Sequence, residues 1–239
     1  MINFIYNQKN TFLAISAMVI GVIFIDIHGL IVKYLGGEYS TIQLALFRNT
    51  FAIIPLILLL IYNKESSDLF KNLNKKFILF CFIRGSCFLA INILYYIAIN
   101  NMEFATASTL TFSSTFFIVI LSIFFLGDRV GIYRWSAVII GFVGVVMIMK
   151  PNSSIFSYYS ILPILVAFLW AVQVIVLKFI PDNFTTGKIQ FYSLFSSFLG
   201  SLIFIFFTTG HTYIESNTDF LILSFIGIFG GTAAILFIY

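Results

Sequence analysis

Residues 82–96 read FIRGSCFLAINILYY, and residues 225–239 read FIGIFGGTAAILFIY. The two segments share Phe-Ile at the start, Ala at the ninth position and Tyr at the fifteenth. Each lies in an apolar run, and the chain reaches Tyr239 while the second run continues. We therefore expect a membrane protein built from two similar halves, of which the second is cut short.

The composition of the chain agrees with a membrane protein. Of the 239 residues, 61% are hydrophobic and 9% are charged, and the mean hydropathy is +1.07. Such a chain has too little polar surface to coat a water-soluble globule. Charge-poor windows near the roughly 20 residues needed to cross a bilayer lie at 12–34, 41–62, 77–99, 104–126, 132–149, 158–179, 186–208 and 219–239. We expect about eight spans, all helical, because an open strand cannot satisfy its backbone in lipid.

The basic residues favour a cytoplasmic N-terminus. That orientation leaves only Lys33 and Lys150 at outer ends. It places inside the basic residues Lys9, Lys64, Lys71, Lys75, Lys76, Arg129, Arg134, Lys178 and Lys188. By the positive-inside rule, we predict that the N-terminus is in the cytoplasm. We expect a multi-pass protein of the cell inner (plasma) membrane.

The internal similarity extends to the starts of the two halves. Leu30-Ile31-Val32-Lys33 ends the first span as Ile175-Val176-Leu177-Lys178 ends the sixth, and Ile42-Gln43 reappears as Ile189-Gln190. The repeat is therefore about five helices long, and an odd number of crossings inserts the two halves with opposite orientations. Many secondary transporters have such inverted repeats, with a site near the midplane between the halves.

Motifs between residues 84 and 151 are specific in order and spacing. They are Tyr95-Tyr96-Ile97-Ala98, Ala105-Thr106-Ala107-Ser108, Leu126-Gly127-Asp128-Arg129, Arg134-Trp135, Gly141-Phe142-Val143-Gly144-Val145 and Lys150-Pro151. Together they closely resemble the EamA type of the drug/metabolite transporter superfamily. Segments 24–33 and 170–178 are similar to the two first-helix signatures of that family.

The resemblance implies an all-α polytopic fold of ten helices in two inverted five-helix repeats. Residues 12–150 would form one complete repeat and residues 158–239 an incomplete second one, so about eight of ten helices are present. The chain departs from the family pattern at three positions. Thr115 stands where the fourth helix usually carries Pro, Asp128 replaces the commoner Glu, and Asp26 stands where a small residue is usual.

Four ionisable side chains fall inside predicted spans, namely Asp26, His28, Arg48 and Arg84. Inserting such a group costs about 2.5 to 3.5 kcal/mol, so it should face protein or water. Asp26 and Arg48 lie at nearly equal depth and could pair. The pair would either lock the first two helices together or form a proton site, in which substrate displaces Arg48 and Asp26 takes up a proton. His28 projects from nearly the opposite helix face and is predicted to line the cavity separately.

Arg84 also has two interpretations. It either extends to the lipid headgroups or faces the inner vestibule and binds a carboxylate or phosphate. Asn92, about two turns deeper, would add a polar contact on a similar face. The remaining predicted substrate-binding residues are Tyr96, Trp170 and Gln173, with Gln190 and Tyr95 beside them. The aromatic members could instead be packing or interface residues, and Gly141, Gly144 and Gly200 indicate close helix packing.

These features favour a secondary transporter (permease) that moves a small polar or amphipathic metabolite across the inner membrane by alternating access. Two intramembrane arginines and many aromatic residues, together with the range of the family, point towards amino acids, aromatic metabolites or nucleotide-like solutes such as S-adenosylmethionine or flavins. We expect no enzyme activity, catalytic residue, cofactor, metal or nucleic-acid partner, because the sequence lacks the corresponding motifs. The expected partners are the substrate and the lipid bilayer, with proton exchange left open. The rival interpretation is a truncated, non-transporting membrane protein or assembly partner; a lipid-modifying enzyme is disfavoured by the lack of clustered acid, base and metal ligands.

Overall fold

The computed structural model describes residues 2–128, 130–149, 158–181, 183–208, 214 and 216–237, and side chains from Phe12 onward except at positions 134, 148 and 149. Arg129, Lys150, Pro151 and Tyr239, on which parts of the sequence argument rest, lie outside the described residues. Every regular element in the described ranges is helical.

The helices are α1 (Ile2–Leu35), α2 (Thr41–Phe51), α3 (Ile53–Tyr62), α4 (Lys75–Asn101), α5 (Phe104–Thr111), α6 (Ser114–Leu126), α7 (Ile132–Met149), α8 (Ile161–Lys178), α9 (Thr186–Thr208) and α10 (Asn217–Leu236), with short 3-10 turns η1 (Ser66–Asp68) and η2 (Tyr158–Ser160). Within the described residues, seven segments are long and apolar enough to span a membrane, and Trp135–Met147 in α7 is a shorter apolar helix. The predicted all-helical, polytopic membrane fold is thus confirmed.

Two of the predicted spans are interrupted, which the hydropathy windows did not indicate. The span Thr41–Tyr62 breaks into α2 and α3 at Ala52. Pro55 follows the break in the first turn of α3, where its missing N–H costs least. The span Phe104–Leu126 breaks between α5 and α6, where Ser113 Oγ donates to the Leu110 carbonyl at 2.7 Å. Such hydroxyl bonds to the preceding turn bend helices, so this span breaks without a proline.

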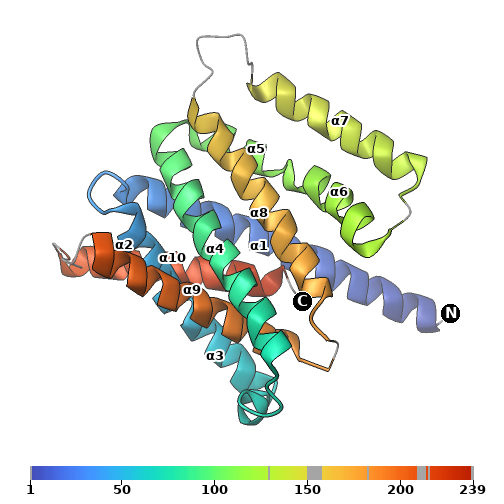
Figure 1. The fold of residues 1–239 in the computed structure, drawn as a ribbon, viewed down its shortest axis with the longest axis horizontal. Coiled ribbons are helices and arrows are strands. Elements are labelled where there is room, and N and C mark those ends of the chain that lie inside the picture. The colour runs from blue at the N-terminus through green and yellow to red at the C-terminus, as the bar shows by residue number, and fades with distance from the viewer. Residues whose placement is uncertain are drawn as a thin grey trace.

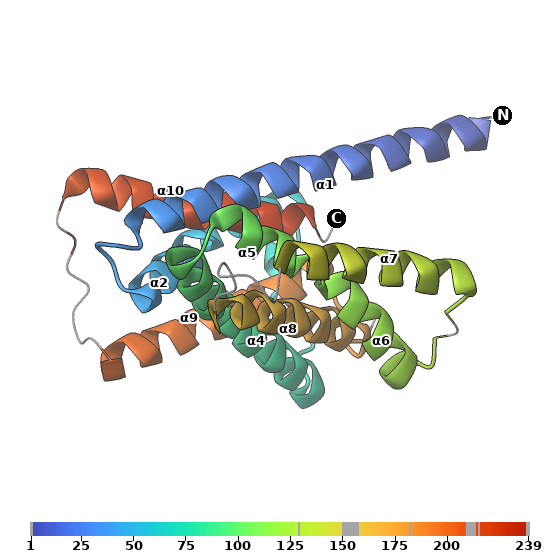
Figure 2. The same ribbon diagram turned by 90° about the horizontal axis from the view of Figure 1, so that it is seen from above.

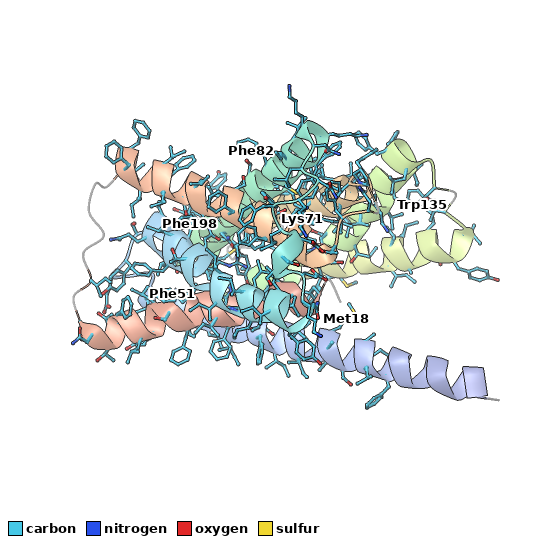
Figure 3. All side chains as sticks on the ribbon, turned by 90° about the horizontal axis from the view of Figure 1, so that it is seen from below. Met18, Phe51, Lys71, Phe82, Trp135 and Phe198 are labelled. Carbon is cyan, nitrogen blue, oxygen red and sulfur yellow. The ribbon has the colours of Figure 1, made fainter. Side chains whose placement is uncertain are left out.

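The helices form one bundle in which α4 is central (Figure 1). Helix α4 packs against α8 and α9, while α10 packs against α1, α2 and α3. Helices α1 and α10 run side by side, and α7 lies on the outside next to α5 and α6 (Figure 2). Large apolar side chains point outward from the bundle, among them Met18 and Phe82 (Figure 3). This is the arrangement expected of a protein whose surface faces lipid.

Glycines allow the helices from the two halves to approach closely. A Cβ atom on Gly227 of α10 would lie 2.4 Å from the Phe51 Cβ, and one on Gly231 would lie 2.8 Å from the Ala52 Cα. Helices α4 and α9 approach each other in the same way: a Cβ on Gly85 of α4 would lie 2.3 Å from the Ser193 carbonyl oxygen of α9. These backbones touch as in other small-residue membrane interfaces.

The predicted packing role of small residues holds only in part. A Cβ on Gly200 would meet Leu89 Cδ2 at 2.7 Å, which agrees with close packing. Among the described residues, no side-chain or neighbouring-helix atom lies within 4 Å of that position at Gly141 or Gly144 of α7. The packing interpretation is wrong for these two, because α7 lies at the edge of the described bundle.

Candidate functional site

Arg48 lies at the junction of α2, α4 and α10. Its side chain is 4% exposed, and its guanidinium lies over the Phe88 ring, with Cζ 4.0 Å from the ring centroid. Nη1 donates to Asn49 Oδ1 at 3.3 Å and Nη2 donates to the Gly230 carbonyl at 3.2 Å. Nε has no hydrogen-bond partner within the described part of the chain. Arg48 is therefore held in place by neutral groups, and its Nε–H is left without one in the ranges that the structure describes.

Asn49 extends this polar contact to the second half of the chain. The residue is fully buried, and its Nδ2 donates to the Ser197 carbonyl of α9 at 3.4 Å. Sequence reasoning missed Asn49, Phe88 and Ser197. An amide inside an apolar span, directly after an arginine, was a usable signal for Asn49.

His28 and Tyr96 form a second buried polar contact close to Arg48. His28 Nε2 lies 2.7 Å from the Tyr96 hydroxyl, and both side chains are buried. A Cβ on Gly230 would lie 3.1 Å from Arg48 Nε and 3.3 Å from His28 Cδ2. Three of the residues predicted from the sequence, His28, Arg48 and Tyr96, therefore meet around Gly230.

Asp26 lies apart from this group, and the predicted ion pair with Arg48 is wrong. Asp26 is exposed, and the hydrogen bonds of Arg48 go to Asn49 and Gly230. Two residues at equal depth in neighbouring helices still point away from each other if the helices are rotated about their axes so that the side chains face different directions. Because α1 is continuous through Gly29, residues 26 and 28 project from nearly opposite faces, and the His28 face is the one that packs inward.

Arg84 binds across the interface between α4 and α9. Its Nη1 donates to Gln190 Oε1 at 2.9 Å, and the side chain is 7% exposed. Its Nε lacks a partner among the residues described. The interpretation that Arg84 extends to the headgroups is wrong, because its guanidinium points into the bundle and not along the lipid surface.

A narrow crevice joins the two arginine contacts. It is lined by residues of α2, α3, α9 and α10, including Arg48, Leu56, Gln190, Leu194, Gly231 and Ala234. Gln190, which accepts from Arg84, therefore faces the same space as Arg48. In this conformation the crevice has no room even for a water molecule, whereas small-molecule pockets enclose roughly 300 to 1,000 Å³. The crevice as it stands is too small for a metabolite.

The other predicted residues are distributed along α4 and α8. Asn92 and Gln173 are buried, and neither Asn92 Nδ2 nor Gln173 Nε2 has a hydrogen-bond partner in the described ranges. Trp170 is half-buried and meets Phe237 edge to face, with ring centroids 6.4 Å apart. Tyr95, beside the site, shares a 2.9 Å hydrogen bond with Ser108. Neither Asn92 nor Gln173 lines the crevice at Arg48.

The buried charges in and around the site are all positive. Among the described residues, the buried charged side chains are Arg48, Arg84 and Lys188, and no buried residue is acidic. No group of three or more His, Cys, Asp or Glu side chains within these ranges could hold a metal ion. Guanidinium and amide donors next to Phe88 suit a flat solute that carries hydrogen-bond acceptors.

Comparison with known proteins shows the family of the chain. The sequence model of the EamA-like transporter family matches residues 12–150, more than half of the chain. A riboflavin transporter of Rhizobium johnstonii is 40% identical over 63 residues, 26% of this chain and 21% of that protein. Riboflavin transporters of Vibrio cholerae (32% over 78 residues) and Brucella anthropi (33% over 79 residues) each match 33% of this chain. These two matches span 26% and 28% of the relatives' own lengths.

Proposed function

Because this chain belongs to the EamA-like transporter family, we propose that it is a permease that moves a small metabolite across the cell inner membrane by alternating access. The observation that carries this proposal is the pair of buried arginines, of which Arg48 donates to Gly230 on α10 and Arg84 donates to Gln190 on α9. Buried donors inside a membrane bundle are costly and mark substrate pathways. Here they lie where helices from both ends of the chain meet.

Alternating access is supported by how the helices pair. We propose that residues 12–150 and 158–239 are two inverted repeats. Exchanging the repeats would exchange α4 with α10, α8 with α1 and α9 with the α2–α3 span. The observed pairs α4–α8 and α1–α10 then correspond, as do α4–α9 and α10–α2. Rocking of one half against the other would open the crevice, which is too small for a metabolite as it stands.

Riboflavin is the substrate that we propose for this permease. It is the solute named for the three relatives. Its flat ring system carries carbonyl acceptors, to which the guanidinium of Arg48 could donate while Phe88 contacts the ring. Arg84 and Gln190, with His28 and Tyr96 on the other side of Arg48, would supply further polar contacts. Asn92, Gln173 and Trp170 would contact the solute only after the helices move.

We further propose that the N-terminus is cytoplasmic. We also propose that Asp26 exchanges a proton during transport. An acidic group within a membrane-spanning helix is costly unless it is used or covered. In this proposal Asp26 acts without Arg48, since the two are not paired in the structure.

The test is uptake and efflux of a panel of labelled metabolites, including riboflavin, in cells that contain the protein, Arg48→Ala or Arg84→Ala. We expect uptake of one solute, lost in both variants, with membrane insertion unchanged. The matched control is Lys178→Ala, which removes an exposed cation. Normal insertion with no uptake of any solute would contradict the proposal.

A further inference from the structure

Lys188, near the start of α9, lies outside the proposed substrate site, yet it is a buried cation at only 6% exposure. Its Nζ donates to the main-chain carbonyls of Asp68 (3.1 Å) and Lys71. The ammonium also lies 5.3 Å from the ring centroid of Phe184 and 5.8 Å from that of Phe77. A buried charge is tolerated only with such partners, so Lys188 fastens the loop between α3 and α4 to α9.

The side chain of Asp68 is hydrogen-bonded to Lys71. Lys71 Nζ donates to Asp68 Oδ1 at 2.8 Å, and this hydrogen bond, the Lys71 charge and, to a smaller extent, the Lys188 charge hold the pKa of Asp68 below its usual value. The Asp68 carboxylate is therefore charged and engaged at neutral pH. Lys188 thus binds the loop through its backbone. Figure 3 labels Lys71 within this loop.

Further contacts join the same two regions. Thr185 Oγ1 donates to Glu65 Oε2 at 2.9 Å, and the Tyr192 hydroxyl donates to the Leu69 carbonyl at 3.2 Å. Phe77 stacks on Phe184 with ring centroids 4.0 Å apart. The start of α4 and its preceding loop are thereby held against the start of α9. Gln190, which lines the crevice, is only two residues beyond Lys188.

A corresponding contact lies at the opposite end of the bundle. The Tyr39 hydroxyl, just before α2, donates to Asp219 Oδ2 in the first turn of α10 at 2.8 Å. Nearby, Lys33 Nζ donates to the Met102 carbonyl, directly after α4. Since α4 has 27 residues and rises about 1.5 Å per residue, this end is about 40 Å from the Lys188 contact. Figure 1 shows α2 and α10 starting on the left, away from the α3–α4 loop at the lower edge.

The two contacts join corresponding elements of the proposed repeats, because α9 corresponds to the α2–α3 span and α4 to α10. We infer that Lys188 and the Tyr39–Asp219 pair are two gates, each of which closes one end of the crevice. Both contacts are formed in the structure. Transport then requires that one gate releases while the other holds. This inference rests on the proposed permease function but concerns residues outside the substrate site.

The test measures access to the crevice and needs no transport. In a Cys81→Ala/Cys87→Ala background, Ala234→Cys places a thiol on the crevice wall. Membrane-impermeant maleimide is then applied to right-side-out or inside-out vesicles. We expect Lys188→Met to raise labelling from one side by about tenfold, as for the loss of a charged hydrogen bond. Tyr39→Phe should raise labelling from the opposite side.

Matched controls separate gating from general loosening. Lys178→Met removes an exposed cation at the same end as Lys188, and Tyr34→Phe changes an exposed tyrosine near Tyr39. Asp68→Asn leaves the main-chain acceptors of Lys188 in place and removes only a smaller charge interaction, so it should change labelling much less than Lys188→Met does. Lys188→Arg keeps the cation, so its labelling should stay near the starting level. Unchanged labelling in Lys188→Met and Tyr39→Phe, or a rise from the same side in both, would overturn the inference. Because labelling is independent of uptake, such a result would leave the proposed permease function standing.

Discussion

The guanidinium of Arg48 lies over the ring of Phe88, with 4.0 Å between Cζ and the ring centroid. Arg48 is on α2 and Phe88 is on α4, so the contact joins the second and third spans of the chain. The Gly230 carbonyl on α10 accepts from the same guanidinium. One side chain thus connects helices from both halves at the crevice.

Arg48→Lys should lower transport almost as far as Arg48→Ala does. A lysine keeps the charge but loses the planar group that stacks on Phe88 and the geometry that reaches two acceptors. The measurement is initial uptake rate at equal amounts of inserted protein. If Arg48→Lys took up solute at the wild-type rate, the charge alone would be sufficient, and the proposed contact with Phe88 would be contradicted.

Gly227→Ala should destabilise the protein by roughly 1 to 3 kcal/mol, the usual cost of overpacking. The added Cβ would lie 2.4 Å from Phe51 Cβ and 2.9 Å from backbone atoms of Arg48 and Ala52, which cannot move aside easily. Thermal unfolding in detergent measures the change. Gly144→Ala is the control, because its Cβ would meet nothing within 4 Å. Equal loss of stability in both variants would show that the α10–α2 contact is not tight.

Tyr96→Phe should destabilise the protein by about 1 to 3 kcal/mol, because the buried His28 loses its hydroxyl partner. Tyr34→Phe, at an exposed tyrosine, should have no effect. Both can be compared by the midpoint of thermal unfolding. A variant as stable as the parent would mean that His28 finds another partner.

Asp26→Asn should abolish any dependence of uptake on an imposed pH gradient. Among the described acidic residues, Asp26 lies deepest in a membrane-spanning segment, whereas Asp219 is in the first turn of its helix. Uptake without a gradient should persist, since Asp26 does not contact Arg48. The readout is uptake into proteoliposomes at several internal pH values. A gradient dependence that survives the substitution would exclude Asp26 as the proton acceptor.

Much of the fold could be predicted from the sequence, because crossing a bilayer demands long apolar helices. Each predicted window coincides with one helix or with a broken pair of helices. The breaks at Ala52 and Ser113 were not predicted. Hydropathy is insensitive to them, since a proline or a serine hydroxyl changes the backbone without making the segment polar.

The candidate site was predicted in part. Ionisable groups inside spans identified His28, Arg48 and Arg84, which are buried as expected for costly groups. The pairing of Asp26 with Arg48 failed, because a sequence gives the depth of a residue in its helix but not the rotation of that helix. Arg48 finds Phe88 and Gly230, 40 and 182 residues along the chain, through packing that no local pattern indicates.

The most direct test of the proposed function is riboflavin counterflow. Proteoliposomes loaded with unlabelled riboflavin are diluted into trace labelled riboflavin, and internal label is followed with time. A permease predicts a transient accumulation of label above the outside concentration, absent in Arg48→Ala that inserts normally. Entry at the rate of protein-free liposomes, with intact folded protein in the membrane, would contradict riboflavin transport by this chain.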